Sequence, residues 1–130
     1  MDLQLSPDDE PKVMSEPEIA EHLKHIPLWT RESNTITRII TPIRYHAGVA
    51  LIVHVADLSR LIHHHADIHL GAGTSPTDRP RPDSIRFTIT SHDAGEVLTD
   101  ADFLLARGID QLVATHSSSW DIADPHQGHR

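Results

Sequence analysis

The chain of 130 residues contains no cysteine, which excludes disulfide bonds and thiolate metal sites. Aromatic residues make up only 4% and hydrophobic residues 38%, enough for one modest core in a single domain. The longest apolar run, 47–53, is far too short to cross a bilayer. The acidic N-terminus lacks the long apolar region of a signal peptide. We therefore expect a cytoplasmic protein with no membrane partner.

Positive charge is also scarce. Lysine and arginine number 11 against 19 aspartates and glutamates, which gives a formal net charge of −8. Nucleic-acid affinity comes largely from basic side chains that neutralise phosphates, so direct nucleic-acid binding is not expected. Histidine, in contrast, is abundant, with 12 residues. It is the side chain that exchanges protons near neutral pH, so acid/base chemistry is a reasonable hypothesis.

The hydrophobic pattern predicts three helices and four extended segments. The expected order is a helix at 15–27, extended chain from 29, a strand at 35–43, a long helix at 45–65, strands at 67–71 and 84–91, and a helix from 99 to about 115. This order predicts an α+β fold with helices on one face of an antiparallel sheet. Composition predicts a flexible arm at 1–13, a domain at 14–115 and a polar tail at 116–130.

The segment 45–65 has the strongest helical signal, because apolar residues recur every three or four positions along one face. They are Leu51, Val55, Leu58 and Ile62. Three successive histidines end this segment, and neighbouring helical residues point about 100° apart. His64 and His65 should therefore face different surroundings, one the core side and one a neighbouring cleft. The C-terminal end of a helix also stabilises imidazolium, which favours a proton donor there.

Three short motifs follow one another in a specific order. They are His64-His65-Ala66-Asp67-Ile68, Ser91-His92-Asp93-Ala94-Gly95 and Leu98-Thr99-Asp100-Ala101-Asp102. In this order they resemble the pterin-4a-carbinolamine dehydratase family. That family has a histidine pair after a long helix, a strand ending in Thr-His-Asp, and a helix that carries an aspartate. The resemblance extends over residues 14 to 113.

The resemblance implies a four-stranded antiparallel sheet, assembled as a homodimer or homotetramer, and a small-molecule pterin partner. In the family reaction, 4a-hydroxytetrahydropterin loses water and becomes quinonoid dihydropterin. The pterin is the substrate, so no cofactor and no metal are expected. Histidine suits both proton transfers because it titrates near the working pH. The implied catalytic residues are His64, His65 and His92, and the implied binding or orienting residues are Asp67, Asp93 and Asp102.

Two questions stay open at this point. The sequence does not assign the acid to one histidine and the base to another. Asp102 also has a second explanation, since an acid in the first turn of a helix stabilises that turn whether or not it orients a histidine.

Five departures from the family pattern surround the expected pocket. They are alanine at position 66 in place of proline, arginine at 60 where glutamate is common, the lack of an aromatic residue at 69–72, the long segment 74–83, and one extra residue at 96–97. These changes allow an alternative, a dehydratase-like binding, coactivator or assembly protein with altered catalysis. Proteins of this fold are known to act as a transcription coactivator and as a Rubisco assembly factor, so this alternative has a precedent.

A metal site is the third hypothesis, since His63 to His65 are followed by His69. Consecutive helical residues diverge and cannot share one ion, and the usual helical pair is spaced four residues apart within a helix. No cysteine or nearby glutamate completes a ligand set. We therefore expect no metal.

Overall fold

The computed structural model describes residues 11–71, 83–91, 95 and 97–116, and every structural statement below refers to these residues. Their secondary structure follows the expected order. It consists of α1 (Glu16–Leu23), β1 (Thr30–Glu32), β2 (Thr35–Ile40), α2 (Tyr45–Ile62), β3 (Asp67–Leu70), β4 (Ile85–Ile89) and α3 (Asp100–His116).

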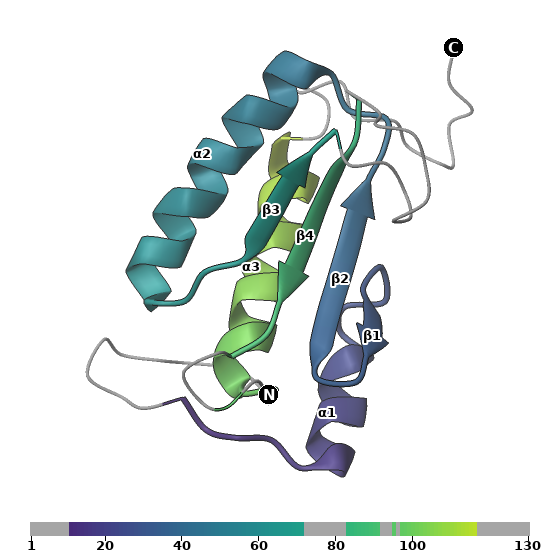
Figure 1. The fold of residues 1–130 in the computed structure, drawn as a ribbon, viewed down its shortest axis with the longest axis vertical. Helices are drawn as coiled ribbons and strands as arrows, with labels where there is room; N and C mark the ends of the chain where they lie inside the picture. Colours follow the sequence, from purple (N-terminus) through teal and green to yellow (C-terminus); the bar gives the residue numbers. More distant parts are fainter. Residues whose placement is uncertain (1–10, 72–82, 92–94, 96, 117–130) are drawn as a thin grey trace.

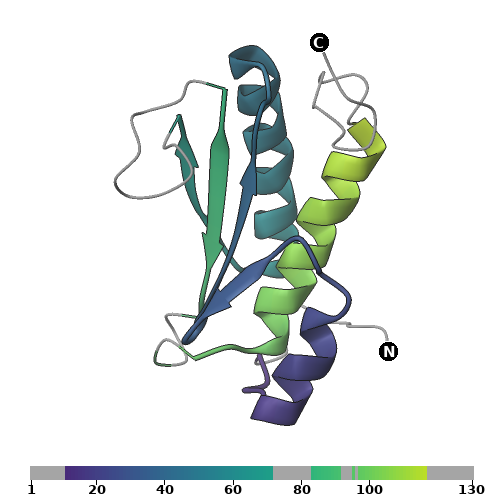
Figure 2. The ribbon, with the colours of Figure 1, turned by 90° about the vertical axis from the view of Figure 1, so that its right-hand side faces the viewer.

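The four strands form one sheet in the order β1-β2-β4-β3, with every neighbouring pair antiparallel. The two long helices run side by side on one face of the sheet, with α1 beyond the start of α3 (Figures 1 and 2). The predicted fold, an α+β architecture with helices on one face of a four-stranded antiparallel sheet, is confirmed.

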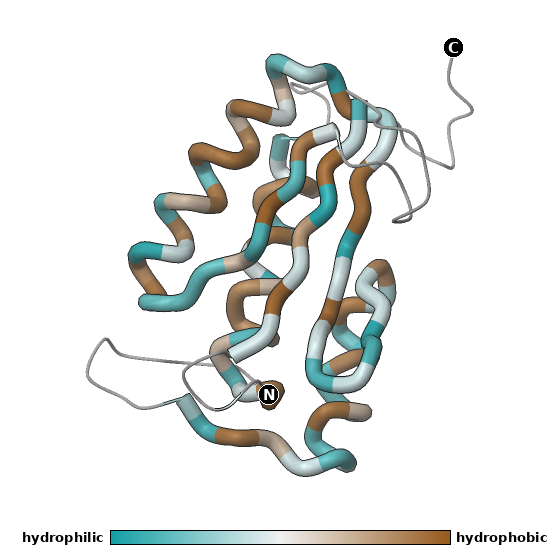
Figure 3. Tube along the Cα trace, viewed as in Figure 1, coloured by the Kyte–Doolittle hydropathy of each residue, from teal (hydrophilic) through white to brown (hydrophobic). Residues whose placement is uncertain are grey.

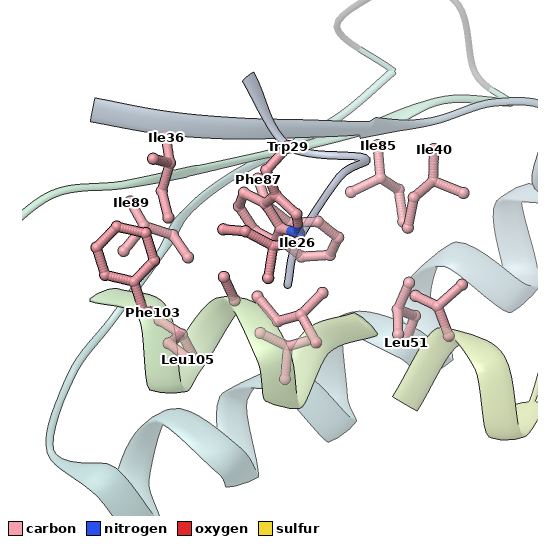
Figure 4. Close-up of a cluster of buried hydrophobic side chains, with 14 of the residues drawn as sticks. Ile26, Trp29, Ile36, Ile40, Leu51, Ile85, Phe87, Ile89, Phe103 and Leu105 are labelled. Carbon is pink, nitrogen blue, oxygen red and sulfur yellow. The ribbon is translucent and has the colours of Figure 1, made fainter. Parts of the chain in front are cut away.

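The core lies between the sheet and the helices. Ile85, Phe87 and Ile89 of β4 are fully buried, whereas the residues between them are partly exposed, so the alternation expected for this strand is confirmed. Phe103 of α3 approaches Ile89 from the helical layer, whereas Leu105 lies on the side of α3 that faces away from the sheet (Figure 4). Burying each of these side chains contributes about 1.5–3 kcal/mol. This packing fixes the first turn of α3 against the sheet.

A capping box begins α1, as the sequence predicts. The backbone N–H of Ser15 donates to Glu18 Oε1 at 2.9 Å, and the N–H of Glu18 donates to Ser15 Oγ at 3.4 Å. The hydrogen bond from the Ser15 backbone, with the nearby Lys12 amine, lowers the pKa of Glu18 to about 2. The two reciprocal bonds satisfy amides that have no partner within the helix.

The long helix ends earlier than predicted, at Ile62 instead of His65. His63 adopts the left-handed conformation, with φ 55°, and its N–H donates to the carbonyl of Ser59. The N–H of His64 donates to the same carbonyl at 3.0 Å. A left-handed residue after the last turn is a common way to end a helix. The helix therefore stops without the proline that Ala66 replaces.

Two apolar faces run along α2 (Figure 3). The predicted inner face is confirmed, since Leu51 and Val55 are fully buried in the core. A second face was not predicted. Tyr45, Val49 and Val53 follow one another at steps of four and remain 61%, 42% and 56% exposed. Despite its apolar character, α2 is not a candidate membrane span, and neither is any other helix in the described part of the chain.

The segment before α1 pairs with the start of α3. The N–H of Met14 donates to the carbonyl of Leu98 at 3.1 Å, and the N–H of Asp100 donates to that of Lys12 at 3.0 Å. These bonds attach residues 12–14 to the domain. The expected arm and tail lie mostly at 1–10 and 117–130, outside the described residues, so their boundaries stay predictions.

Candidate active site

Three chain segments meet at one end of the sheet. The C-terminal end of α2, the end of β4 and the first turn of α3 all lie toward the lower end of the molecule in Figure 1. Each segment supplies one polar side chain to a connected cluster: His64, Ser91 and Asp102. The three side chains are therefore positioned by the two long helices and a central strand, which are the most regular elements of the fold.

His64 and Asp102 form the central contact. Nε2 of His64 lies 2.7 Å from Oδ1 of Asp102, and the two residues are 38 positions apart in sequence. The side chain of Asp102 is fully buried, and that of His64 is 14% exposed. One edge of the imidazole is thus held by a buried carboxyl group while the residue keeps access to solvent.

The other carboxyl oxygen of Asp102 serves the helix. Oδ2 accepts the N–H of Thr99 at 2.7 Å and the hydroxyl of Ser91 at 2.8 Å. Thr99 directly precedes α3, and its N–H is one of the amides that a helix leaves unpaired. Both explanations of Asp102 therefore hold at once: one oxygen caps the helix and the other contacts a histidine.

This pattern decides which ring nitrogen of His64 carries the proton. Oδ2 accepts two donors, as the oxygen of a carboxylate does. An ionised carboxyl group only accepts, so Nε2 of His64 must donate to Oδ1. In the neutral ring, Nδ1 then carries the lone pair and can accept a proton from a ligand. A carboxylate in this position holds the imidazole in one tautomer and stabilises the imidazolium that forms.

The other predicted site residues do not join this contact. Beyond His63 the chain is extended and its side chains alternate, so His65 and Asp67 are exposed while His64 is partly buried. The two histidines do face different surroundings, but the cause is an extended segment instead of helical rotation. His92 and Asp93 lie outside the described residues. The prediction that His64, His65 and His92 converge on one cleft therefore stays a prediction.

Ser91 and Thr99 were not among the predicted site residues. Their side-chain oxygens lie 2.7 Å apart, and both residues are buried, Ser91 at 3% exposure and Thr99 at 0%. The sequence did offer a signal for Ser91, because its hydroxyl directly precedes His92 in the second motif.

The histidine-rich segment contains no ligand set for a metal. Among the described residues, no three or more histidine, aspartate or glutamate side chains are grouped closely enough to hold an ion. His69 instead lies with Nδ1 3.1 Å from a guanidinium nitrogen of Arg86, on the neighbouring strand.

A second histidine contacts the next residue of α3. The ring of His22, in α1, stacks on the ring of Phe103 with centroids 5.3 Å apart and an interplanar angle of 27°. His22 is 6% exposed, and its Nδ1 has no hydrogen-bond partner among the described residues. Burial lowers the pKa of His22, and the positive charges of His25 and Arg107 lower it further.

The fold, the order of the motifs and the buried His64–Asp102 contact define a class of protein. The chain belongs to the pterin 4 alpha carbinolamine dehydratase family, whose sequence model matches residues 12–112.

Relatives of known sequence and structure agree with this assignment. A protein of Chloroflexus aurantiacus, provisionally named a pterin-4-alpha-carbinolamine dehydratase, is 38% identical over 100 residues, 77% of this chain and 96% of the relative. One of Streptomyces avermitilis with the same provisional name is 28% identical over 106 residues, 82% and 95% of the two chains. The crystal structure of a transcriptional coactivator/pterin dehydratase from Brucella melitensis superimposes with a TM-score of 0.62 at 16% identity. It covers 78% of this chain and 98% of that one, and shows a shared fold.

Proposed function

We propose that this protein is a dehydratase that removes water from 4a-hydroxytetrahydropterin and releases quinonoid dihydropterin. The observation that carries the proposal is the 2.7 Å contact between His64 and the buried Asp102. It provides a proton acceptor, held in one tautomer, at a position where the family pattern has a histidine.

The reaction requires two proton transfers. The bond between C4a and the hydroxyl oxygen breaks, the hydroxyl leaves as water after gaining a proton, and N5 loses its hydrogen as the C4a–N5 double bond forms. Nδ1 of His64 suits the proton from N5, because Asp102 stabilises the resulting imidazolium. His65 and His92 are the proposed donors to the leaving hydroxyl. Each positioned transfer contributes on the order of 10²–10⁴-fold in rate.

The proposed substrate needs no separate cofactor or metal. The pterin supplies both the leaving hydroxyl and the hydrogen, so proton transfer completes the reaction. Asp67 and Asp93 are proposed to accept hydrogen bonds from N–H groups of the pterin ring, since an ionised carboxylate offers only acceptors.

We also propose that the protein assembles as a homodimer or homotetramer. The exposed apolar face of α2, formed by Tyr45, Val49 and Val53, supports this, because a symmetric contact would remove it from water. Sedimentation should give a mass at least twice that of the 14.5 kDa chain. A monomer at concentrations of tens of micromolar would contradict the proposal.

The same face favours the second candidate function, a binding or assembly protein on this fold with altered catalysis. A heterologous partner could cover Tyr45, Val49 and Val53 as well as a second copy could. Arg60 lies in the last turn of α2 and is exposed. In this second function it would be a polar contact at the edge of that surface.

A dehydration assay distinguishes the two functions. The 4a-carbinolamine is generated in place by a pterin-dependent hydroxylase, and quinonoid dihydropterin is followed with and without the protein. A dehydratase raises the rate above the spontaneous dehydration, and His65→Ala or His92→Ala lowers it by about 10²-fold each.

His63→Asn is the matched control. It removes an exposed imidazole next to the pair, and asparagine tolerates the left-handed conformation. It should keep the full rate. A wild-type protein that binds a pterin but gives no acceleration would favour the binding protein.

A further inference from the structure

We infer that Ser91 and Thr99 are positioning residues for His64, acting through Asp102. The inference rests on the proposed function for its effect on rate, but its effect on the imidazole is independent of any substrate. Neither residue needs to touch the pterin. Together they fix the orientation of the carboxylate that selects the tautomer of His64.

The two hydroxyl groups donate in sequence, Thr99 to Ser91 and Ser91 to Asp102. Thr99 Oγ1 lies 2.7 Å from Ser91 Oγ but 3.4 Å from Asp102 Oδ2, so its hydrogen is better used on Ser91. The hydroxyl of Ser91 then donates to Oδ2 at 2.8 Å. Each hydroxyl has a single hydrogen, so this order leaves Oδ2 with two close donors, the second being the N–H of Thr99 at 2.7 Å.

These donors matter because Asp102 is fully buried. His64, which can become positive, contacts the other oxygen of this carboxyl group. Without the Ser91 hydroxyl, Oδ2 keeps one close donor, the N–H of Thr99, so the carboxylate is held less firmly in the orientation that places Oδ1 against Nε2 of His64. A weaker Nε2–H···Oδ1 bond favours the Nε2–H tautomer less. The ring then offers the lone pair on Nδ1 to the substrate less often.

The backbone holds both hydroxyl groups in place. The N–H of Ser91 donates to the carbonyl of Val97, shortly before α3, at 3.3 Å. Thr99 forms a bridge with Val13, in the segment that precedes α1. Because the backbone of both residues is held, their hydroxyl groups do not have to reorganise when the charge on His64 changes. This is the usual advantage of a preorganised site.

The test compares Ser91→Ala with Thr90→Ala. Both remove one hydroxyl from neighbouring positions after β4, but Thr90 Oγ1 donates to the carbonyl of Asn34 at 2.6 Å and not to Asp102. The ring nitrogens of His64 are observed by nitrogen NMR in the protein without substrate, with the signal assigned by its loss in His64→Gln. We expect mainly the Nε2–H tautomer in the wild type and in Thr90→Ala, and an increased Nδ1–H fraction in Ser91→Ala.

Kinetics give the second readout. Ser91→Ala should lower kcat by about 10-fold with little change in KM, the effect of losing one hydrogen bond to a charged group. Ser91→Thr should restore both the tautomer and kcat, because it keeps the hydroxyl and the family pattern has threonine at this position. Ser91→Val has the shape of the restoring Ser91→Thr variant and lacks only its hydroxyl, so it serves as the deciding variant if Ser91→Ala does not fold.

The outcomes separate the two proposals. An unchanged tautomer in the folded Ser91→Ala or Ser91→Val protein overturns the positioning role, whatever the activity. A changed tautomer in a protein whose wild type does not accelerate dehydration supports the positioning role and counts against the dehydratase. A change of equal size in Thr90→Ala would mean that the effect is not specific to the cluster, and would also overturn the inference.

Discussion

His22 and His64 contact consecutive residues in the first turn of α3, yet their surroundings differ in kind. His64 lies with Nε2 2.7 Å from the carboxyl group of Asp102. His22 stacks on the ring of Phe103 and leaves its buried Nδ1 without a hydrogen-bond partner among the described residues. One side of the turn therefore presents a negative group to an imidazole, and the other presents an apolar surface.

The difference shows how one residue type is assigned to two roles. In the proposed function, His64 is the residue that accepts a proton, and the buried carboxylate of Asp102 holds its imidazole. Burial against Phe103 disfavours the charged form, and the pKa of His22 is lowered accordingly. His22 is thus a packing residue that should remain neutral. An abundance of histidine says little about chemistry until the partner of each ring is known.

The largest expected effect is on stability, at the apolar side of the turn. Phe103 is fully buried, and Phe103→Ala should lower the free energy of unfolding by about 3–5 kcal/mol, since it loses apolar burial and leaves a cavity. Chemical denaturation measures the change. The conservative Phe103→Leu should lose clearly less. A loss below about 1 kcal/mol for alanine would mean that the ring does not hold the turn in place.

A smaller effect, confined to the rate, is expected at the polar side. In Asp102→Asn the amide can still accept the N–H of Thr99 but presents N–H to Nε2 of His64, which then has to accept. The imidazole hydrogen moves to Nδ1, and the dehydration rate should fall by about 10²-fold, or about 2.7 kcal/mol. Steady-state kinetics at several pH values checks this. A rate within a factor of about two of wild type would show that the carboxylate does not set the tautomer.

The smallest expected effect is the pH dependence that His22 contributes. As the pH falls through its ordinary value of 6.5, His22 takes up a proton in the unfolded chain but not yet in the folded protein, because its folded pKa is lowered. The folded state then binds fewer protons, so the free energy of unfolding decreases on acidification. His22→Leu should remove this part of the decrease. Denaturation of both proteins at pH 7 and at successively lower pH measures it, and parallel curves would refute the packing role.

Local sequence predicted most of the fold for physical reasons that the structure bears out. The capping box at Ser15 and Glu18 and the alternation along β4 depend on neighbours within a few residues. The end of α2 was wrong by three residues, because His63 adopts a left-handed conformation that no propensity predicts for histidine.

The contacts of the candidate site were not predicted from the sequence, and the convergence of its catalytic residues stays a prediction. The motifs named His64 and Asp102, yet a contact across 38 positions depends on how two helices pack, which sequence periodicity does not give. Ser91 and Thr99 were missed for a related reason. A hydroxyl after a strand or before a helix is the ordinary way to satisfy chain ends, so its role in a cluster becomes visible only in three dimensions.

The most direct test of the account exchanges one imidazole at a time for the same polar, uncharged side chain. His64→Gln and His22→Gln are compared with wild type in the dehydration assay, at equal concentrations of folded protein. We expect wild type and His22→Gln to accelerate dehydration equally, and His64→Gln to lose about 10²-fold of that acceleration. Full acceleration by His64→Gln would contradict the claim that the His64–Asp102 pair transfers the proton.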